Sequence, residues 1–121
     1  MNGPISLRIC LEEHYALVRI GGELDFASAP ATQDFLLQAL AGCDVRLIVD
    51  VAGVTFIDLT GMDALQLAGR NAARRGGWVR LVGPGPQFRR VLHLLQVTAF
   101  VPTYTTVLDA TIADTPVAAP G

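Results

Sequence analysis

Polar and apolar positions alternate along the first stretch of the chain in the way that β-strands require. Residues 6–11 place leucine or isoleucine at every second position, and residues 16–20 form a second short run rich in branched apolar side chains. Polar residues 12–14 separate the two runs, and Gly21-Gly22 follows the second. The pattern predicts an N-terminal β-hairpin whose second strand ends at the glycine pair.

Helical spacing follows the hairpin. Ser28 and Pro30 mark the start of a helix that Gly42 ends. The next apolar run, Val45 to Val51, has too few polar residues to expose a face, which is typical of an interior strand covered by helices on both sides. The helix that begins near Ser28 and ends at Gly42 is expected to bury one stripe of apolar side chains: Ala31, Phe35, Leu36, Ala39 and Leu40.

Strand and helix alternate again toward the C-terminus. A helix is predicted from Thr60 to about Arg75, followed by a strand at residues 78–82 and a helix that opens at Pro86. Repeated strand–helix–strand units favour parallel pairing. We therefore expect an α/β fold, in which the hairpin continues into a mixed, mostly parallel sheet of about four or five strands with about four helices. The central helix should bury Met62, Leu65, Ala68, Gly69 and Ala72.

The C-terminal part contributes a last apolar strand at residues 99–102 and a short helix. Thr106 and Asp109 have the spacing of a helix cap. The small, proline-containing residues 113–121 are predicted to form a frayed tail. With 121 residues, of which 51% are hydrophobic, the chain is expected to be a single domain, 1–121, with its core at about 5–112.

Charge and cysteine content exclude several classes of protein. The net charge of −2 and the pI near 5.5 provide no field for a nucleic acid. The apolar runs are shorter than the roughly 20 residues of a membrane span, and no secretory signal is visible, so a cytoplasmic protein is expected. Cys10 and Cys43 lack metal-ligand spacing and are predicted to be free thiols. We expect no metal and no other cofactor.

The candidate chemistry lies where the apolar approach to the central helix breaks at Asp58. Thr60 is followed three residues later by Asp63, which predicts a capping box with the threonine hydroxyl as the N-cap. A hydroxyl at this point lies at the positive end of the helix dipole, where a phosphate is stabilised.

This stretch resembles the phosphorylation loop of the STAS domains of anti-sigma factor antagonists, which typically contain Asp-Ser-Ser-Gly-Leu. Asp58 matches the aspartate, Leu59 replaces the first serine, and Thr60 falls on the phosphorylated serine. Gly61 and Met62 match the glycine and the leucine. The segment Gly22-Glu23-Leu24-Asp25 resembles a second family signature, and the likeness extends over about residues 5–112. The family usually ends its third helix with a glycine, and Gln96 in its place predicts a different exit from that helix.

The resemblance implies a phosphorylation-controlled binding module without enzymatic activity. Unphosphorylated at Thr60, the chain would bind an anti-sigma factor kinase of the histidine-kinase-like ATPase type and so free a sigma factor. A phosphatase would be a further partner, and the chain would be a monomer or weak dimer. Because loops after parallel strands gather at one edge of a sheet, Asp25 and Asp58 are expected near Thr60. There they would position its hydroxyl or a kinase-bound magnesium. The implied partner-binding residues are Asp25, Asp58, Leu59, Thr60, Gly61, Met62 and Asp63.

Two other functions remain open. A scaffold subunit of a larger signalling assembly would keep the fold and use Thr60 as contact surface, with no phosphorylation and no sigma factor. A small enzyme would need a general base beside Thr60. His14 is predicted in a turn and His93 on a helix exterior, so the sequence supplies no evident base.

Overall fold

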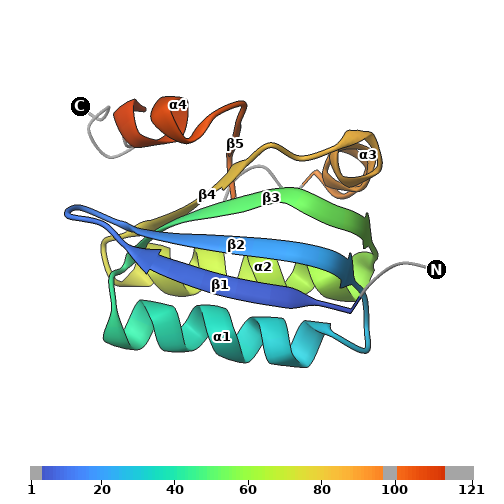
Figure 1. Cartoon of the computed structure of the whole chain (residues 1–121), viewed down its shortest axis with the longest axis horizontal. Helices are drawn as coiled ribbons and strands as arrows, with labels where there is room; N and C mark the ends of the chain where they lie inside the picture. Colours follow the sequence, from blue (N-terminus) through green and yellow to red (C-terminus); the bar gives the residue numbers. More distant parts are fainter. Residues whose placement is uncertain (1–3, 97–100, 114–121) are drawn as a thin grey trace.

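One mixed sheet of five strands forms the centre of the molecule (Figure 1). The computed structural model describes residues 4–96 and 101–113. Strands β1 and β2 are antiparallel, and the other neighbouring pairs are parallel, which confirms the predicted α/β class with its N-terminal hairpin. In spatial order the strands are β1 (Ser6–Leu11), β2 (Ala16–Leu24), β3 (Arg46–Ile57), β4 (Trp78–Val82) and β5 (Thr103–Tyr104).

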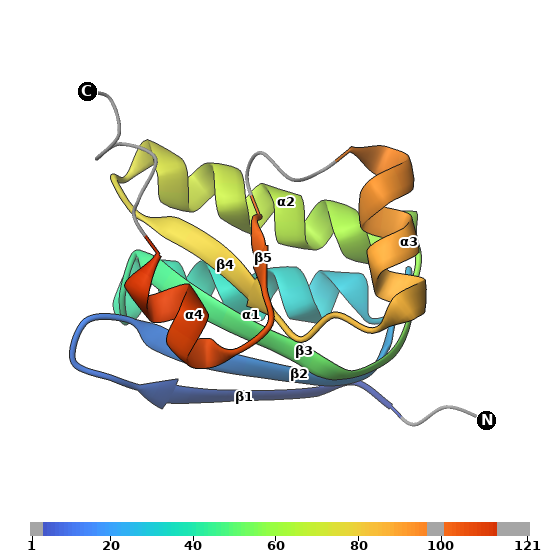
Figure 2. The ribbon, with the colours of Figure 1, turned by 90° about the horizontal axis from the view of Figure 1, so that it is seen from above.

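Helices cover both faces of the sheet. Helices α1 (Ala29–Gly42) and α2 (Leu59–Arg74) lie side by side on one face, and the short α4 (Val107–Ile112) lies on the other (Figures 1 and 2). Helix α3 (Pro86–Leu95) packs against β3, at the end of the sheet where α2 begins (Figure 2). The two outer layers give the interior strands apolar neighbours on both sides, as their sequence predicts.

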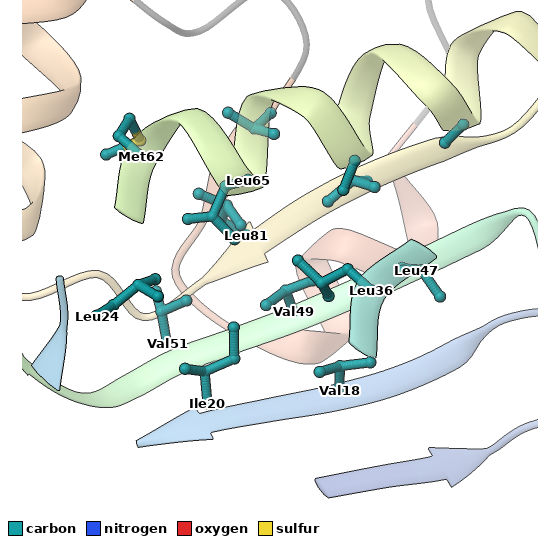
Figure 3. Close-up of a cluster of buried hydrophobic side chains, with 14 of the residues drawn as sticks. Val18, Ile20, Leu24, Leu36, Leu47, Val49, Val51, Met62, Leu65 and Leu81 are labelled. Atoms are coloured by element: carbon teal, nitrogen blue, oxygen red, sulfur yellow. The ribbon is translucent and has the colours of Figure 1, made fainter. Parts of the chain in front are cut away.

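Alternate residues of the strands enter two separate cores. Val18 and Ile20 of β2 and Val49 of β3 point to the same side of the sheet as Met62 and Leu65 of α2 (Figure 3). The intervening positions Leu17, Ile48 and Val82 form a smaller cluster with Ala110 of α4. All five predicted core positions of α2 are buried, which confirms the helical spacing from which they were identified.

Strands β2 and β3 are longer than predicted because glycine pairs with glycine within the sheet. Gly21 lies opposite Gly53, and a Cβ on Gly53 would lie 3.3 Å from the Gly21 Cα. The register shifts beside this pair, and both strands continue past it to Leu24 and Ile57. The prediction that the glycine pair ends the second strand was therefore wrong. Here glycine permits a close approach of two backbones at an irregularity of the sheet.

The buried face of α1 is rotated relative to the prediction. Leu36, Ala39 and Leu40 are buried as expected, whereas Ala31 is exposed and Phe35 only half-buried. Thr32 is buried instead, because its hydroxyl donates a hydrogen bond of 3.0 Å to the Ser28 carbonyl. A hydroxyl that makes a hydrogen bond can be buried in the core, and the spacing of the apolar residues does not predict its burial.

The C-terminal elements differ from their predicted limits. Residues 97–100 lie outside the described chain, so the strand predicted at 99–102 is tested only in part, and the observed β5 comes after it. Gln96 adopts a left-handed conformation, φ 53° and ψ 42°, so it ends α3 in a conformation that glycine commonly adopts there. The chain that follows Gln96 lies outside the described residues, so the predicted change of the helix exit stays a prediction. Thr106 caps α4 by accepting from the Asp109 N–H at 3.1 Å, as expected, and the predicted tail beyond residue 113 lies outside the described chain.

A buried arginine joins α4 to the sheet. Arg80 of β4 is 2% exposed, and its Nη1 donates to the Ala110 carbonyl at 2.7 Å, near the negative end of α4. Its guanidinium carbon lies 3.8 Å from the centroid of a Trp78 ring. Burial lowers the pKa of the Arg80 guanidinium. Nη2 is buried and has no hydrogen-bond partner within the described residues, so the site solvates the charge incompletely.

Substitutions of Arg80 are expected to separate its packing from its charge. Arg80→Ala should lower the free energy of unfolding by about 2–4 kcal/mol, because it removes the contact with α4 and leaves a cavity. Arg80→Met fills most of that volume without a buried charge and should stay within about 1 kcal/mol of the natural protein. Urea denaturation followed by circular dichroism measures both. Equal losses in the two variants would contradict this interpretation.

Candidate functional site at the carboxyl ends of β2 and β3

The candidate site lies where two parallel strands end side by side. Leu24, the last residue of β2, is the register partner of Ile57, the last residue of β3. The Asp58 N–H donates to the Leu24 carbonyl at 3.3 Å. The loop that begins at Asp25 and the start of α2 therefore share one edge of the sheet, as the parallel topology predicts.

The Asp58 carboxylate connects the two loops. Its Oδ1 accepts from the Gly61 N–H at 2.9 Å, and its Oδ2 accepts from the Phe26 N–H at 3.1 Å. Asp58 has the extended backbone of an N-cap residue, φ −118° and ψ −174°. The predicted cap at Thr60 was wrong: α2 begins at Leu59, and Thr60 lies within its first turn.

Asp25 shapes the loop between β2 and α1. Its Oδ1 accepts from the Ala27 N–H at 3.0 Å and from the Ser28 N–H at 3.1 Å, which is the local pattern of an aspartate turn. The Ser28 hydroxyl donates to the Glu23 carbonyl at 2.7 Å. The carboxylates of Asp25 and Asp58 thus hold backbone N–H groups. Their positioning of a hydroxyl or a magnesium stays a prediction.

Two residues of the predicted partner-binding set are buried. A Cβ on Gly61 would lie 2.2 Å from the Leu24 carbonyl oxygen, so only glycine fits where α2 crosses the end of β2. The Met62 side chain is completely buried in the core (Figure 3). Gly61 and Met62 therefore anchor the start of α2 and offer no side-chain surface to a partner.

The exposed part of this edge is a small surface that combines apolar and polar groups. Leu59 is 59% exposed, and Phe26, which the sequence analysis did not identify, is 73% exposed. The Asp58–Phe26 hydrogen bond holds Phe26 beside the first turn of α2. Thr60 and Asp63 are also exposed. We call these four residues, Phe26, Leu59, Thr60 and Asp63, the Thr60 surface. The sequence contains one signal for Phe26: it is a large aromatic residue in a turn, where it belongs to none of the predicted apolar stripes.

Gln87 fixes the neighbouring helix to the end of β3. Its side-chain amide accepts from the Ile57 N–H at 3.0 Å and donates to the Ile57 carbonyl at 2.8 Å. This paired bond satisfies the last backbone groups of the strand directly before Asp58. Gln87 could not be identified from the sequence, because a polar residue in the first turn of a helix carries no signal of a distant backbone partner.

This edge of the sheet attracts an anion less strongly than the positive end of the α2 dipole would by itself. The first backbone N–H groups of α2 lack carbonyl partners within the helix, and the dipole is positive here. The Asp58 carboxylate takes the Gly61 N–H, and Asp63 adds another acidic group in the second turn. Within residues 4–96 and 101–113, no group of three or more His, Cys, Asp or Glu side chains can hold a metal ion.

The histidines and cysteines lie elsewhere. His14 is exposed in the turn between β1 and β2, and His93 is exposed on α3. The turn between β1 and β2 lies at the end of the sheet away from the start of α2 (Figure 1). Cys10 and Cys43 are exposed free thiols, as predicted. In the part of the chain that the structure describes, every helix is too short or too polar to traverse a lipid bilayer.

Gly61→Ala is expected to destabilise the fold by about 3 kcal/mol or more, because the new methyl group would meet the backbone of β2. Gly42→Ala, at the end of α1, is the matched control, since a Cβ there meets nothing within 4 Å. Thermal unfolding by calorimetry measures both. A Gly61→Ala protein as stable as the control would show that α2 can move away from Leu24 at little cost.

The assignment of the helix cap can be tested in the same way. Asp58→Ala should lower the free energy of unfolding by about 1–2 kcal/mol, because it removes the cap and the bond to Phe26. Thr60→Ala should change it by less than about 0.5 kcal/mol, as expected of an exposed position that caps nothing. Urea denaturation of the two variants distinguishes the observed cap from the predicted one. A larger loss in Thr60→Ala would favour the threonine.

Comparison with known proteins adds evidence on the family. RsfB of Mycobacterium tuberculosis, an anti-sigma-F factor antagonist, is 26% identical over 114 residues, which cover 91% of this chain and 91% of that protein. A crystal structure of an anti-sigma factor antagonist from Mycobacterium paratuberculosis has a TM-score of 0.80 at 26% identity, over 89% of this chain and 92% of that one. The Bacillus cell fate determinant SpoIIAA, in its phosphorylated form, shares the fold with a TM-score of 0.67 at 19% identity, over 89% of this chain and 96% of that one. The STAS domain model matches residues 9–110, so this chain belongs to the STAS domain family.

Proposed function

We propose that this chain is an anti-sigma factor antagonist whose binding is controlled by phosphorylation of Thr60. Without phosphate it binds an anti-sigma factor that is also a kinase, and so frees a sigma factor in the cytoplasm. The likeness to RsfB along nearly the whole chain supports the class of function. The observation that carries the regulatory part is an exposed threonine in the first turn of α2, beside the exposed side chains of Phe26 and Leu59.

In this role the chain is a binding module and not an enzyme. Phe26 and Leu59 supply the apolar contact that a protein interface needs at its centre, because large apolar side chains there provide most of the binding energy. Asp58 and Asp63 supply negative charge at its border. A partner that fits this arrangement presents an apolar recess for Phe26 and Leu59.

Phosphate at Thr60 changes the surface more than the fold. It adds a charge of about −1.5 to −2. At the first turn of a helix this charge is stabilising or neutral for the helix itself. The effect must therefore arise when the interface forms. The phosphate adds volume beside Leu59, and a partner that excludes water strengthens its repulsion of Asp58 and Asp63 at the same edge. A loss of two to three orders of magnitude in affinity requires only about 3–4 kcal/mol, which a desolvated like-charge contact supplies.

A phosphatase that removes the phosphate from Thr60 completes the cycle. Because Thr60 is exposed and its neighbour Leu59 projects into solvent, both enzymes can approach the hydroxyl without unfolding α2. Asp25 contributes indirectly, since its hydrogen bonds hold the loop that carries Phe26.

The proposal predicts opposite outcomes for two substitutions of one residue. Thr60→Ala should bind the cognate anti-sigma factor kinase within about threefold of the natural affinity and resist phosphorylation, because it removes the acceptor from a surface that remains intact. Thr60→Glu should bind about a hundredfold more weakly, since it places a negative charge at the interface. Isothermal titration calorimetry measures the affinity, and mass spectrometry after incubation with kinase and ATP locates the phosphate.

Thr105→Glu is the matched control, because Thr105 is exposed and precedes α4 on the opposite face of the sheet. It should bind normally and still accept phosphate at Thr60. Phosphate on another residue, or full binding by Thr60→Glu, would overturn the proposed control.

A further inference from the structure

The outer edge of β1 is uncovered. β1 is the first strand of the sheet and pairs only with β2 among the described strands, so its other side presents backbone N–H and C=O groups without a strand partner. Two of its apolar side chains are unusually accessible: Ile9 is 39% exposed and Leu11 is 65% exposed. Because they are two residues apart, they lie on the same face of the strand.

The same strand carries a positive charge that no carboxylate of the described residues pairs with. Arg8 lies directly opposite Arg19 of β2, and like charges at such positions destabilise a sheet. Arg19 has a carboxylate nearby, with its Nε 3.4 Å from the Asp50 Oδ2. None of the ion pairs in the described chain involves Arg8. A carboxylate on the free side of β1 would compensate this charge.

Symmetry limits how this strand can pair with a second copy of itself. In antiparallel pairing, directly opposite side chains lie on the same face of the sheet. Around a two-fold axis, the residue numbers of every directly opposite pair therefore add up to the same even number. One register places Arg8 opposite Glu12 of the second copy and Ile9 opposite Leu11 of the second copy. In this register Cys10 meets Cys10 of the second copy on the two-fold axis.

Neighbouring registers bring less favourable side chains together. With the axis at Arg8, the two copies of Arg8 lie opposite each other. With the axis at Ile9, Arg8 lies opposite Cys10 of the second copy. A shift to Leu11 places Ile9 against Glu13 of the second copy. Only the register centred on Cys10 joins every exposed apolar side chain of the edge to another and gives each Arg8 a carboxylate.

We propose that this chain forms a two-fold dimer by antiparallel pairing of β1 with β1 of a second copy, centred on Cys10. The two sheets then become continuous, and the exposed edge is covered. Cys10 lies toward the hairpin end of the sheet, whereas Thr60 lies at the end where β2 and β3 stop (Figure 1). The dimer therefore leaves both Thr60 surfaces accessible, and it can present two of them at once.

The test uses the full chain in sedimentation velocity runs over a range of concentrations. The natural protein should show a monomer–dimer equilibrium. Arg8→Glu should weaken the dimer by about tenfold or more, because it opposes two pairs of carboxylates, and Arg8→Glu combined with Glu12→Arg should restore it. If Arg8→Glu fails to fold, Leu11→Glu serves instead, since it places a charge opposite Ile9 at a position that is exposed in the monomer.

Cysteine oxidation tests the register independently. The Cys10 Sγ lies 3.4 Å from the Glu12 Oε2, and this hydrogen bond together with the Glu12 charge raises the pKa of the Cys10 thiol, so mildly alkaline buffer is needed. A Cys43→Ser protein should form a disulfide-linked dimer through Cys10, and a Cys10→Ser protein should not. A chain that remains monomeric at every concentration, a dimer unaffected by Arg8→Glu and Leu11→Glu, or cross-linking through Cys43 alone would overturn the proposal. Phosphorylation of Thr60 does not enter either measurement.

Discussion

A single carboxylate determines the geometry of the Thr60 surface. Asp58 caps α2 through one oxygen and holds the loop after β2 through the other, at 2.9 and 3.1 Å. Strand pairing brings the two segments to the same edge, and this pair of hydrogen bonds joins the Phe26 loop to the first turn of α2. Because each bond satisfies a backbone N–H group at a helix start or a turn, the arrangement stabilises the fold and orients Phe26 and Leu59 together.

Some residues around Asp58 hold α2 and α3 in place, and others are exposed to solvent. Gly61 and Met62 attach the start of α2 to the core, and Gln87 attaches α3 to the end of β3. Leu59 and Thr60 project outward from the same turn. The proposed phosphate on the threonine would therefore leave the contacts of Gly61, Met62 and Gln87 in place. This physical separation is the basis for the proposed switch, which changes binding and leaves the architecture unaltered.

The sheet gives the molecule two distinct ends. At one end the parallel strands stop and present the Thr60 surface; toward the other lies the hairpin that carries Cys10. On the face opposite α1 and α2, Arg80 ties α4 to β4, so the C-terminal helix is part of the fold. The proposed pairing of β1 and the proposed recognition at Thr60 use different residues, and each can operate without the other.

Local patterns in the sequence determined the order of the elements, the α/β class and the buried face of α2, because apolar periodicity records burial directly. They also indicated that Asp25 and Asp58 lie at one edge, since parallel strands bring their carboxyl ends together. Only the tertiary structure decided that Asp58 and not Thr60 caps α2, and that Phe26 and Gln87 belong to the site. It also decided that β2 and β3 continue past the point where Gly21 lies opposite Gly53. The cap depends on where the helix begins, since aspartate and threonine can both accept a bond from a backbone N–H three positions on. The other features depend on a hydrogen bond or a close contact between residues about 30 positions apart in the chain, and no periodicity within a single segment records such a partner.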